Sequence, residues 1–410
     1  MPYIIMKQFT IPFTYRSALI SSIKNKRREQ DKMKKDFSPT QINLGNVEIY
    51  LARHFGFCYG VENAIEIAFK TIEENQGKRI FLLSEMIHNP SVNADLKSKG
   101  VKFLQDTKGN QLISYDELHS NDIVLIPAFG TTLDIEAKLK GIGIAIEYYN
   151  TTCPFVEKVW NRSAQIAENN FTVVIHGKPW HEETRATFSH AAANAPTVVV
   201  NDMADAILFA SYIKEEKTAA EFYSDFEGRY STGFDVAKDL QRIGVVNQTT
   251  MLASDTQAIA DYLKTVMMSR KSNIVSEDRF ADTKDTLCYA TNDNQSAVYG
   301  LLQTAADFAI VVGGYNSSNT SHLVELCEAK LPTYFINDET KIISKMEILH
   351  YDLHQKEEII STDFIPKKAP VKILITSGAS CPDAIVERLI KRIADIFNAE
   401  KRIEELLMEF

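Results

Sequence analysis

A cysteine and a proline occupy the centre of the stretch Asn150-Thr151-Thr152-Cys153-Pro154-Phe155-Val156. An apolar run over residues 142–149 precedes it, and apolar side chains at helical spacing over 156–167 follow it. Because proline suits the first turn of a helix, we expect Cys153 to lie at a strand-to-helix junction. Amide groups at such a junction lower the pKa of a nearby thiol.

Two more cysteines have comparable surroundings. Cys58 precedes an apolar helical pattern over residues 61–72, and Cys288 lies in Asp285-Thr286-Leu287-Cys288-Tyr289-Ala290-Thr291. The three are separated by about one domain length each, so three thiolates from three domains can share one inorganic centre. Spacing alone leaves an iron–sulfur cluster, a zinc ion and unrelated core thiols open, although the close cysteine pairs of structural zinc sites are missing. Cys327 and Cys381 are expected to be core or structural residues.

Length and composition favour an intracellular globular protein. The 410 residues correspond to two or three domains, with 45% hydrophobic and 24% charged residues. No apolar stretch approaches the roughly 20 residues of a membrane span, so no membrane partner is expected. The five cysteines show no disulfide framework, which favours a reducing compartment.

Charge is distributed unevenly. Residues 1–36 carry nine Lys or Arg against three acidic residues, a net charge of +6, while the whole chain carries −9. The acidic remainder argues against a nucleic-acid partner. We interpret residues 1–45 as a flexible basic N-terminal extension of a cytoplasmic protein. A transit peptide is the alternative, because the first 28 residues lack Asp and Glu; the location would then be the plastid stroma.

Strands alternate with helices from residue 46 onward, which predicts an α/β fold with parallel sheets. Expected strands cover residues 47–52, 79–84, 122–127, 172–175, 243–246, 308–313 and 371–376. We divide the chain into α/β domains at 46–152, 153–284 and 285–410, with an insertion at about 202–241. Polar clusters follow several strands, at the sheet edge where α/β proteins bind ligands.

Several of these polar residues are suited to a small anion. Hydroxyl and amide donors precede two expected helices, and two histidines follow other strands: Ser317, Ser318, Asn319, Ser380, His88 and His181. Such donors commonly hold phosphate groups, although serines there can also be plain helix caps. The glycine-rich nucleotide loops are missing.

A carboxylate pair, Glu182 and Glu183, follows His181 directly. A carboxyl group shielded from water can keep a proton and deliver it to a reacting oxygen. Thr249 and Thr250 follow another strand and offer hydroxyl groups to orient that proton. A solvated helix start is the simpler interpretation of the glutamate pair.

Together these motifs resemble the LytB or IspH family of hydroxymethylbutenyl diphosphate reductases, over residues 46–396. The resemblance rests on Gly56-Phe57-Cys58, His88-Asn89, Thr152-Cys153-Pro154, His181-Glu182-Glu183-Thr184, Gln248-Thr249-Thr250, Cys288-Tyr289-Ala290-Thr291, Asn316-Ser317-Ser318-Asn319 and Gly378-Ala379-Ser380. It implies a trefoil of three similar α/β domains around a central 4Fe-4S cluster, with one iron not ligated by the protein. The implied reaction reduces (E)-4-hydroxy-3-methylbut-2-enyl diphosphate to isopentenyl and dimethylallyl diphosphates, the last step of the methylerythritol phosphate pathway, with ferredoxin or flavodoxin as electron donor.

The resemblance also implies roles for individual residues. Cys58, Cys153 and Cys288 would ligate the cluster, Glu183 would supply the proton, and Thr249 would lie beside the substrate hydroxyl. The six anion-binding candidates above would hold the diphosphate. One position departs from the widely known bacterial pattern, because Phe129 stands where a diphosphate-binding histidine is expected; its context looks like the plant and cyanobacterial branch. A zinc-dependent hydrolase and a non-catalytic iron–sulfur redox sensor are the rival interpretations.

Overall fold

The computed structural model describes residues 9–33, 35–269, 279–281 and 286–400, together with Arg402 and Glu405. The chain forms two compact units, each assembled from separate segments. Unit 1 takes the described parts of Met1–Phe69, Ile87–Asp95 and Tyr289–Phe410, and unit 2 takes those of Lys70–Met86 and Leu96–Cys288. Two helices, α2 (Tyr59–Glu74) and α3 (Pro90–Ser98), contribute residues to both units.

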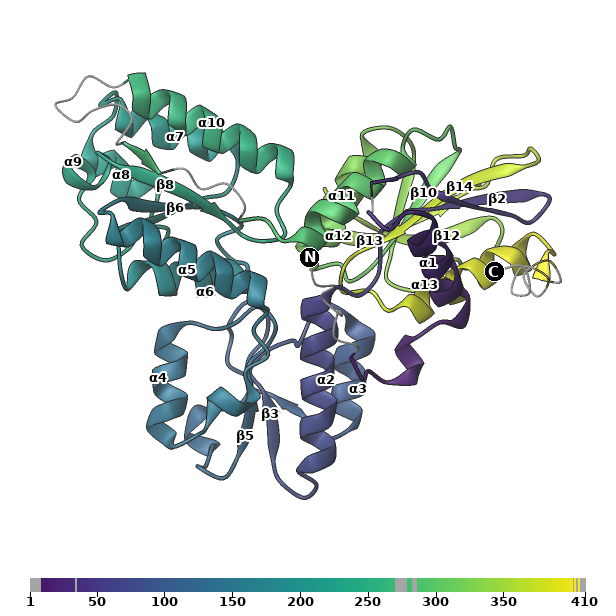
Figure 1. Ribbon diagram of the computed structural model, residues 1–410, viewed down its shortest axis with the longest axis horizontal. Coiled ribbons are helices and arrows are strands. Elements are labelled where there is room, and N and C mark those ends of the chain that lie inside the picture. Colours follow the sequence, from purple (N-terminus) through teal and green to yellow (C-terminus); the bar gives the residue numbers. More distant parts are fainter. Residues whose placement is uncertain are drawn as a thin grey trace. The chain divides into compact units, whose positions relative to one another are not determined.

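Unit 1 contains a five-stranded sheet of order β1-β2-β14-β10-β11 (Figure 1). Its strands are β1 (Thr40–Asn43), β2 (Val47–Leu51), β14 (Val371–Ser377), β10 (Phe308–Val312) and β11 (Thr333–Ile336). Only the β1–β2 pair is antiparallel. The remaining elements are η1 (Phe13–Tyr15), α1 (Ala18–Gln30), α11 (Tyr289–Leu301), α12 (Ser318–Glu328), η5 (Glu339–Lys341), the antiparallel pair β12 (Glu347–Asp352) and β13 (Glu357–Thr362), and α13 (Asp383–Ile396).

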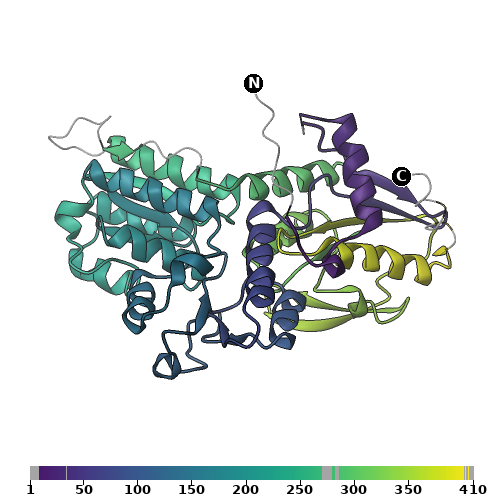
Figure 2. The same cartoon turned by 60° about the horizontal axis from the view of Figure 1, so that its bottom comes forward.

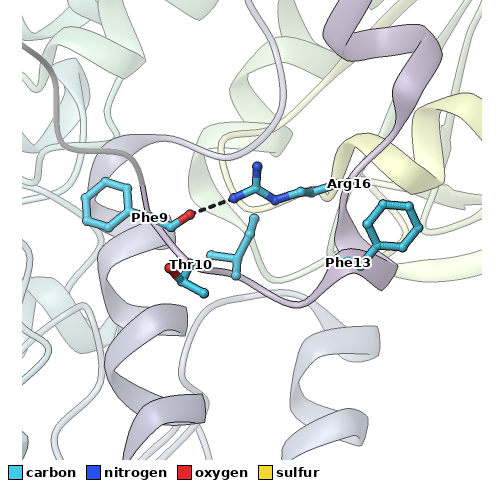
Figure 3. A pocket seen from close by; sticks show the side chains of 5 residues that line it. Phe9, Thr10, Phe13 and Arg16 are labelled. Carbon is cyan, nitrogen blue, oxygen red and sulfur yellow. Dashed lines mark hydrogen bonds between the residues drawn. The ribbon is translucent and has the colours of Figure 1, made fainter.

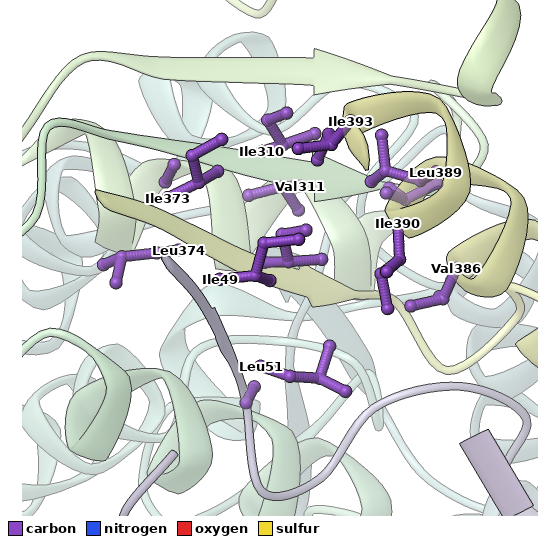
Figure 4. Packing of buried hydrophobic residues seen from close by; sticks show 14 of the residues in the cluster. Ile49, Leu51, Ile310, Val311, Ile373, Leu374, Val386, Leu389, Ile390 and Ile393 are labelled. Atoms are coloured by element: carbon purple, nitrogen blue, oxygen red, sulfur yellow. The ribbon is translucent and has the colours of Figure 1, made fainter. Parts of the chain in front are cut away.

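The core of unit 1 lies between this sheet and α13. Apolar side chains from β2, β10 and β14 meet one face of that helix (Figure 4). The labelled residues are Ile49, Leu51, Ile310, Val311, Ile373, Leu374, Val386, Leu389, Ile390 and Ile393. Strands buried on both faces read as continuous apolar runs, which is why the sequence locates them well. Because β2 pairs with β14, residues 47–51 belong to the same sheet as residues 371–377, although the proposed division assigns them to the 46–152 and 285–410 domains.

The N-terminal segment is part of unit 1. Helix α1 begins after Ser17, whose hydroxyl accepts the Ile20 amide at 2.9 Å, and it buries Leu19, Ile20 and Ile23. It packs against α13 (Figure 2), and Lys24 pairs with Asp383 at 2.7 Å. Residues 18–43 are therefore folded, which corrects the expectation of a flexible extension for this part of residues 1–45; a transit peptide stays a prediction. The apolar residues of α1 recur at helical spacing, but they are few among many basic residues, so the sequence pattern did not predict this helix.

This helix contributes to stability, so we predict that Ile20→Ala lowers the free energy of unfolding by about 2–5 kcal/mol. The side chain is completely buried in the unit 1 core, and its truncation leaves a cavity. Urea unfolding would measure the change, with Asn25→Ala on the exposed side of the same helix as the control. Equal stabilities for the two variants would contradict the packing of α1.

A pocket opens on the segment before α1 (Figure 3). Its lining residues are Phe9, Thr10, Ile11, Phe13 and Arg16. Arg16 donates a hydrogen bond to the Phe9 carbonyl at 2.6 Å, which closes the segment into a loop. None of the predicted site residues lines this pocket, so it does not enter the candidate active site.

Unit 2 contains two small parallel sheets. The first has the order β4-β3-β5, from β3 (Ile80–Leu82), β4 (Lys102–Phe103) and β5 (Ile123–Leu125). The second has the order β7-β6-β8-β9, from β6 (Thr172–His176), β7 (Thr197–Val200), β8 (Ile243–Asn247) and β9 (Phe280–Ala281). The helical elements are η2 (Tyr115–Glu117), α4 (Leu133–Ile142), η3 (Ile146–Tyr149), α5 (Pro154–Glu168), α6 (Glu182–Ala192), α7 (Met203–Ile213), α8 (Ala219–Asp225), α9 (Val236–Asp239) and α10 (Ala253–Ser269).

The second sheet is covered on both faces. Helices α5 and α6 lie on one face, and α7 and α10 lie on the other (Figure 1). Alternate residues of the same strand serve the two cores, as Val174 faces one cluster and Val173 the other. The predicted α/β class with small parallel sheets is confirmed. Among the described residues, no helix combines the length and the apolar character that crossing a membrane requires.

The apolar run before Cys153 differs from its prediction. It forms the end of α4 and the short helix η3, and only Asn150 pairs with the neighbouring sheet, in one parallel bridge to Ile126. Gly143 takes a left-handed conformation (φ 89°) that ends α4, so the run turns before it can extend as a strand. Cys153 nevertheless caps α5, with Pro154 in the first helical turn.

Candidate active site

The anion-binding candidates of unit 1 gather where β10 and β14 end. These strands are parallel neighbours, with Val312 opposite Ser377, so the loops that follow them share one sheet edge. Glycine keeps this edge open, since a Cβ on Gly378 would lie 1.9 Å from the Thr320 hydroxyl oxygen. The first turn of α12 can therefore approach the ends of both strands.

The apolar pattern predicts a helix over residues 321–329, whereas α12 begins at Ser318, which places two candidates in its first turn. Ser317 caps the helix by accepting the Thr320 amide at 3.3 Å. The Asn319 side-chain oxygen accepts the Ala379 amide at 2.9 Å, which ties α12 to the loop after β14. Within the described residues, the Ser318 hydroxyl and the Asn319 side-chain nitrogen are buried without a hydrogen-bond partner. A buried donor left unpaired costs about 1–3 kcal/mol, so this pair indicates a site for an acceptor ligand.

His88 and Ser380 lie at the same edge. The Ser380 hydroxyl donates to the His88 carbonyl at 3.1 Å, and both residues are buried. Gly314 permits this approach, because a Cβ there would lie 2.2 Å from that carbonyl oxygen. Five of the six predicted anion-binding residues therefore belong to unit 1, and they are linked through Ala379, Asn319 and the His88 backbone. Thr376, another buried hydroxyl without a partner in the described residues, was missed because it falls inside the apolar strand β14.

The glutamate pair begins α6 in unit 2. His181 caps this helix, since its Nδ1 accepts the Glu183 amide at 3.2 Å. Glu183 is 1% exposed, and its Oε1 accepts the Thr249 amide at 2.5 Å. The simpler interpretation of a solvated helix start is wrong, because the loop after β8 covers this turn.

The two adjacent glutamates have different partners. Glu182 is also buried, and its Oε1 accepts the hydroxyl of Ser84, which follows β3. Ser84 was not among the predicted residues, because 98 residues separate it from Glu182 and no local pattern connects them. The arrangement anchors Glu182 to one sheet of unit 2 and places Glu183 at the other.

Phe129 contacts one of the predicted ligands. Its ring meets the His181 imidazole edge to face, with ring centroids 5.7 Å apart and an interplanar angle of 85°. At the next residue, a Cβ on Gly130 would lie 2.5 Å from the Trp160 ring. The loop after β5 is therefore packed tightly, and Phe129 is a neighbour of His181 rather than a hydrogen-bond donor.

The cysteines separate into two groups. Cys327 and Cys381 are buried in the unit 1 core, as expected, whereas Cys58, Cys153 and Cys288 are partly exposed. Cys58 belongs to unit 1, and its amide donates to the Ala379 carbonyl at 3.2 Å. Cys153 and Cys288 both belong to unit 2. No described group of three His, Cys, Asp or Glu side chains is arranged to hold a metal ion, so a shared three-cysteine site stays a prediction.

The Cys153 thiol has a raised pKa, contrary to the expectation of a lowered one. Amides of the first α5 turn favour the thiolate, but burial outweighs them, and nearby Cys288 and Glu183 add negative charge, so the pKa rises to about 12. A thiolate at this position therefore needs a cation beside it. A positively charged iron centre would meet this need.

Comparison with known proteins places the chain in a family. The model of the LytB protein family matches residues 49–394. A 4-hydroxy-3-methylbut-2-enyl diphosphate reductase from Picosynechococcus is 37% identical over 92% of this chain and 89% of its own length. The protein of the same name from a Synechococcus strain is 38% identical over 96% of this chain and 91% of its own length.

Two solved structures share the fold. The (E)-4-hydroxy-3-methyl-but-2-enyl diphosphate reductase described as the terminal enzyme of the non-mevalonate pathway matches with a TM-score of 0.50 and 24% identity, over 85% of this chain and 99% of that one. The E-1-hydroxy-2-methyl-but-2-enyl-4-diphosphate reductase of Plasmodium falciparum matches with a TM-score of 0.60 and 22% identity, over 84% and 87% of the two chains. By the extent of the family match and the identity to near-full-length relatives, this chain belongs to the LytB family.

Proposed function

We propose that the chain reduces (E)-4-hydroxy-3-methylbut-2-enyl diphosphate to isopentenyl and dimethylallyl diphosphates. The observation that carries the proposal is the near-full-length similarity to reductases named for this substrate. The reaction consumes two electrons and two protons, breaks the allylic C–O bond and releases water. A proton added at either end of the allylic fragment gives the two products.

We assign the cofactor to the three partly exposed cysteines. Cys58, Cys153 and Cys288 would hold a 4Fe-4S cluster with one iron free of protein ligands. When bound, such a cluster supplies the electrons and a Lewis acid for the substrate hydroxyl. Two observations support the assignment. Cysteine sulfur is a soft ligand that suits iron–sulfur clusters, and burial raises the pKa of the Cys153 thiol, so that a bound cation is needed to stabilise its thiolate.

Proton delivery is assigned to Glu183. Its carboxyl group is shielded from water, and its Oε1 accepts the Thr249 amide. The Thr249 hydroxyl would lie beside the substrate hydroxyl. Protonation of that hydroxyl turns it into a water leaving group, which is general acid catalysis.

Diphosphate binding is assigned to His88, His181, Ser317, Ser318, Asn319 and Ser380. The unpaired donors of Ser318 and Asn319 would complete their hydrogen bonds with phosphate oxygens. Holding the diphosphate in this way fixes the reacting hydroxyl, which is catalysis by positioning. Phe129 stays outside this set, because its ring offers no donor.

We predict that Ser318→Ala weakens substrate binding and leaves the free protein at least as stable. The lost phosphate contact is worth about 1–3 kcal/mol, or about a 5- to 150-fold rise in the substrate Kd. No hydrogen bond of the free protein is lost, since the hydroxyl has no partner among the described residues. Calorimetric titration with the diphosphate and thermal unfolding would measure the two effects; an unchanged Kd would remove Ser318 from the site.

The experiment that tests the function begins with protein purified without oxygen. Iron and acid-labile sulfide per chain are measured first, and turnover of the allylic diphosphate with a chemical reductant follows. We expect equal iron and sulfide, substrate-dependent oxidation of the reductant, and both products. Zinc without sulfide would support the hydrolase instead, and a cluster without turnover would support the sensor; no observation on this chain favours either.

We further propose a ferredoxin or a flavodoxin as the physiological electron donor. Both are small carriers that deliver one electron at a time, as the two-step reduction requires. The bacterial cytoplasm is the proposed location, in keeping with the cyanobacterial relatives. Comparing turnover with each purified carrier would identify the donor.

A further inference from the structure

Gln248 joins the two loops that meet at the proton-donor pair. It is completely buried and directly follows β8. Its amide donates to the carbonyl of His176, the last residue of β6, at 2.8 Å, which continues the pairing with β6 one residue beyond the end of β8. Residues 178–184 after β6 carry Glu183, while the loop after β8 carries Thr249.

The Gln248 side chain makes hydrogen bonds to both loops. Its Oε1 accepts the Lys178 amide at 3.1 Å and the Thr184 hydroxyl at 3.0 Å. Its Nε2 donates to the Thr250 hydroxyl at 2.7 Å. The oxygen therefore holds the loop after β6 at both ends, and the nitrogen holds the residue next to Thr249.

Gly177 allows this close contact. A Cβ there would lie 2.7 Å from the Thr184 hydroxyl oxygen and 3.0 Å from the Gln248 Cβ. Even an alanine side chain would push apart the groups that make the hydrogen bond. The glycine, the threonine and the glutamine thus form one packed unit behind Glu183.

We infer that Gln248 and Thr184 are positioning residues that set the distance between the Glu183 carboxyl group and Thr249. Neither is assigned a contact with substrate. They act by fixing residues 178–184 against the loop after β8, so that the 2.5 Å contact between Glu183 Oε1 and the Thr249 amide is made. The inference rests on the proposed function, in which Glu183 delivers a proton.

The test compares Thr184→Val with Thr184→Ser in protein carrying its full iron content. Valine keeps the shape of threonine but cannot donate to Gln248, whereas serine keeps the hydroxyl. A displacement of the proton donor by a fraction of an ångström to 1 Å lowers kcat by about 10- to 100-fold. We expect this fall for valine, with an unchanged KM and a larger solvent deuterium isotope effect on kcat, and near-normal turnover for serine.

Wild-type kcat and isotope effect in Thr184→Val would overturn the inference, as would equal losses in the valine and serine variants. Thr250→Ala removes the partner of Gln248 Nε2 at a partly exposed position. Thr250→Ala replaces Thr184→Val in the test if the valine variant does not fold. A normal kcat in Thr250→Ala would also overturn the inference. Glu183→Gln is measured in parallel. An inactive Glu183→Gln beside a normal Thr184→Val refutes only this inference, whereas a fully active Glu183→Gln refutes the proton-donor role itself.

Discussion

Glu183→Gln should retain the full iron and sulfide content and lose about 10²- to 10⁴-fold in kcat. The glutamine side chain fits the same space, and its oxygen can accept the Thr249 amide as Glu183 Oε1 does at 2.5 Å. It has no proton to deliver to a leaving hydroxyl. Because the substitution removes the acidic proton and keeps the shape and the hydrogen bond of the side chain, we expect the substrate affinity to change little. Steady-state turnover and an iron assay on the same sample would measure both properties.

Glu182→Gln is the matched control. It changes the adjacent buried carboxylate, which accepts the Ser84 hydroxyl instead of a group on the loop after β8. A glutamine oxygen can accept that hydroxyl equally well, so we expect most of the activity to remain. Similar losses in both variants would contradict the division of roles between the two residues. Normal turnover in Glu183→Gln would contradict proton delivery by this residue.

The sequence predicted the strands well, because parallel strands buried on both faces appear as uninterrupted apolar runs. The expected ranges at 172–175, 243–246 and 308–313 agree with β6, β8 and β10 to within one residue at each end. The strong apolar stripe over residues 383–396 predicts a helix with the same bounds as α13. The start of α12 was placed three residues late because Ser318 and Asn319 are polar and do not continue its apolar pattern.

Long-range contacts could not be predicted from local patterns. The Ser84 contact with Glu182 and the Gln248 contact with Thr184 join residues 98 and 64 positions apart. The pairing of β2 with β14 joins residues more than 300 positions apart, which a division into consecutive segments does not reveal. The effect of burial on Cys153 was missed for the same reason, because the groups that enclose a side chain come from distant parts of the sequence.

Cys153→Ser should lose most of its iron and acid-labile sulfide, and with them all turnover. Serine keeps the size and the helix-capping position of this residue. Its oxygen is a harder ligand than thiolate sulfur, and it binds iron–sulfur clusters poorly. Cys58→Ser and Cys288→Ser should behave in the same way if the three cysteines share one cluster. Iron, sulfide and the visible absorption of anaerobically purified protein would measure the loss.

Cys327→Ala is the control for removing a cysteine without removing a ligand. Cys327 is completely buried in the unit 1 core, so its truncation lowers stability through a small cavity while the iron content stays that of the unsubstituted protein. A full iron complement in Cys153→Ser would refute its ligand role. An iron loss confined to Cys153 and Cys288 would indicate a centre held by unit 2 alone, since Cys58 belongs to unit 1. Only a loss in all three serine variants, with iron retained in Cys327→Ala, is consistent with one cluster held by Cys58, Cys153 and Cys288.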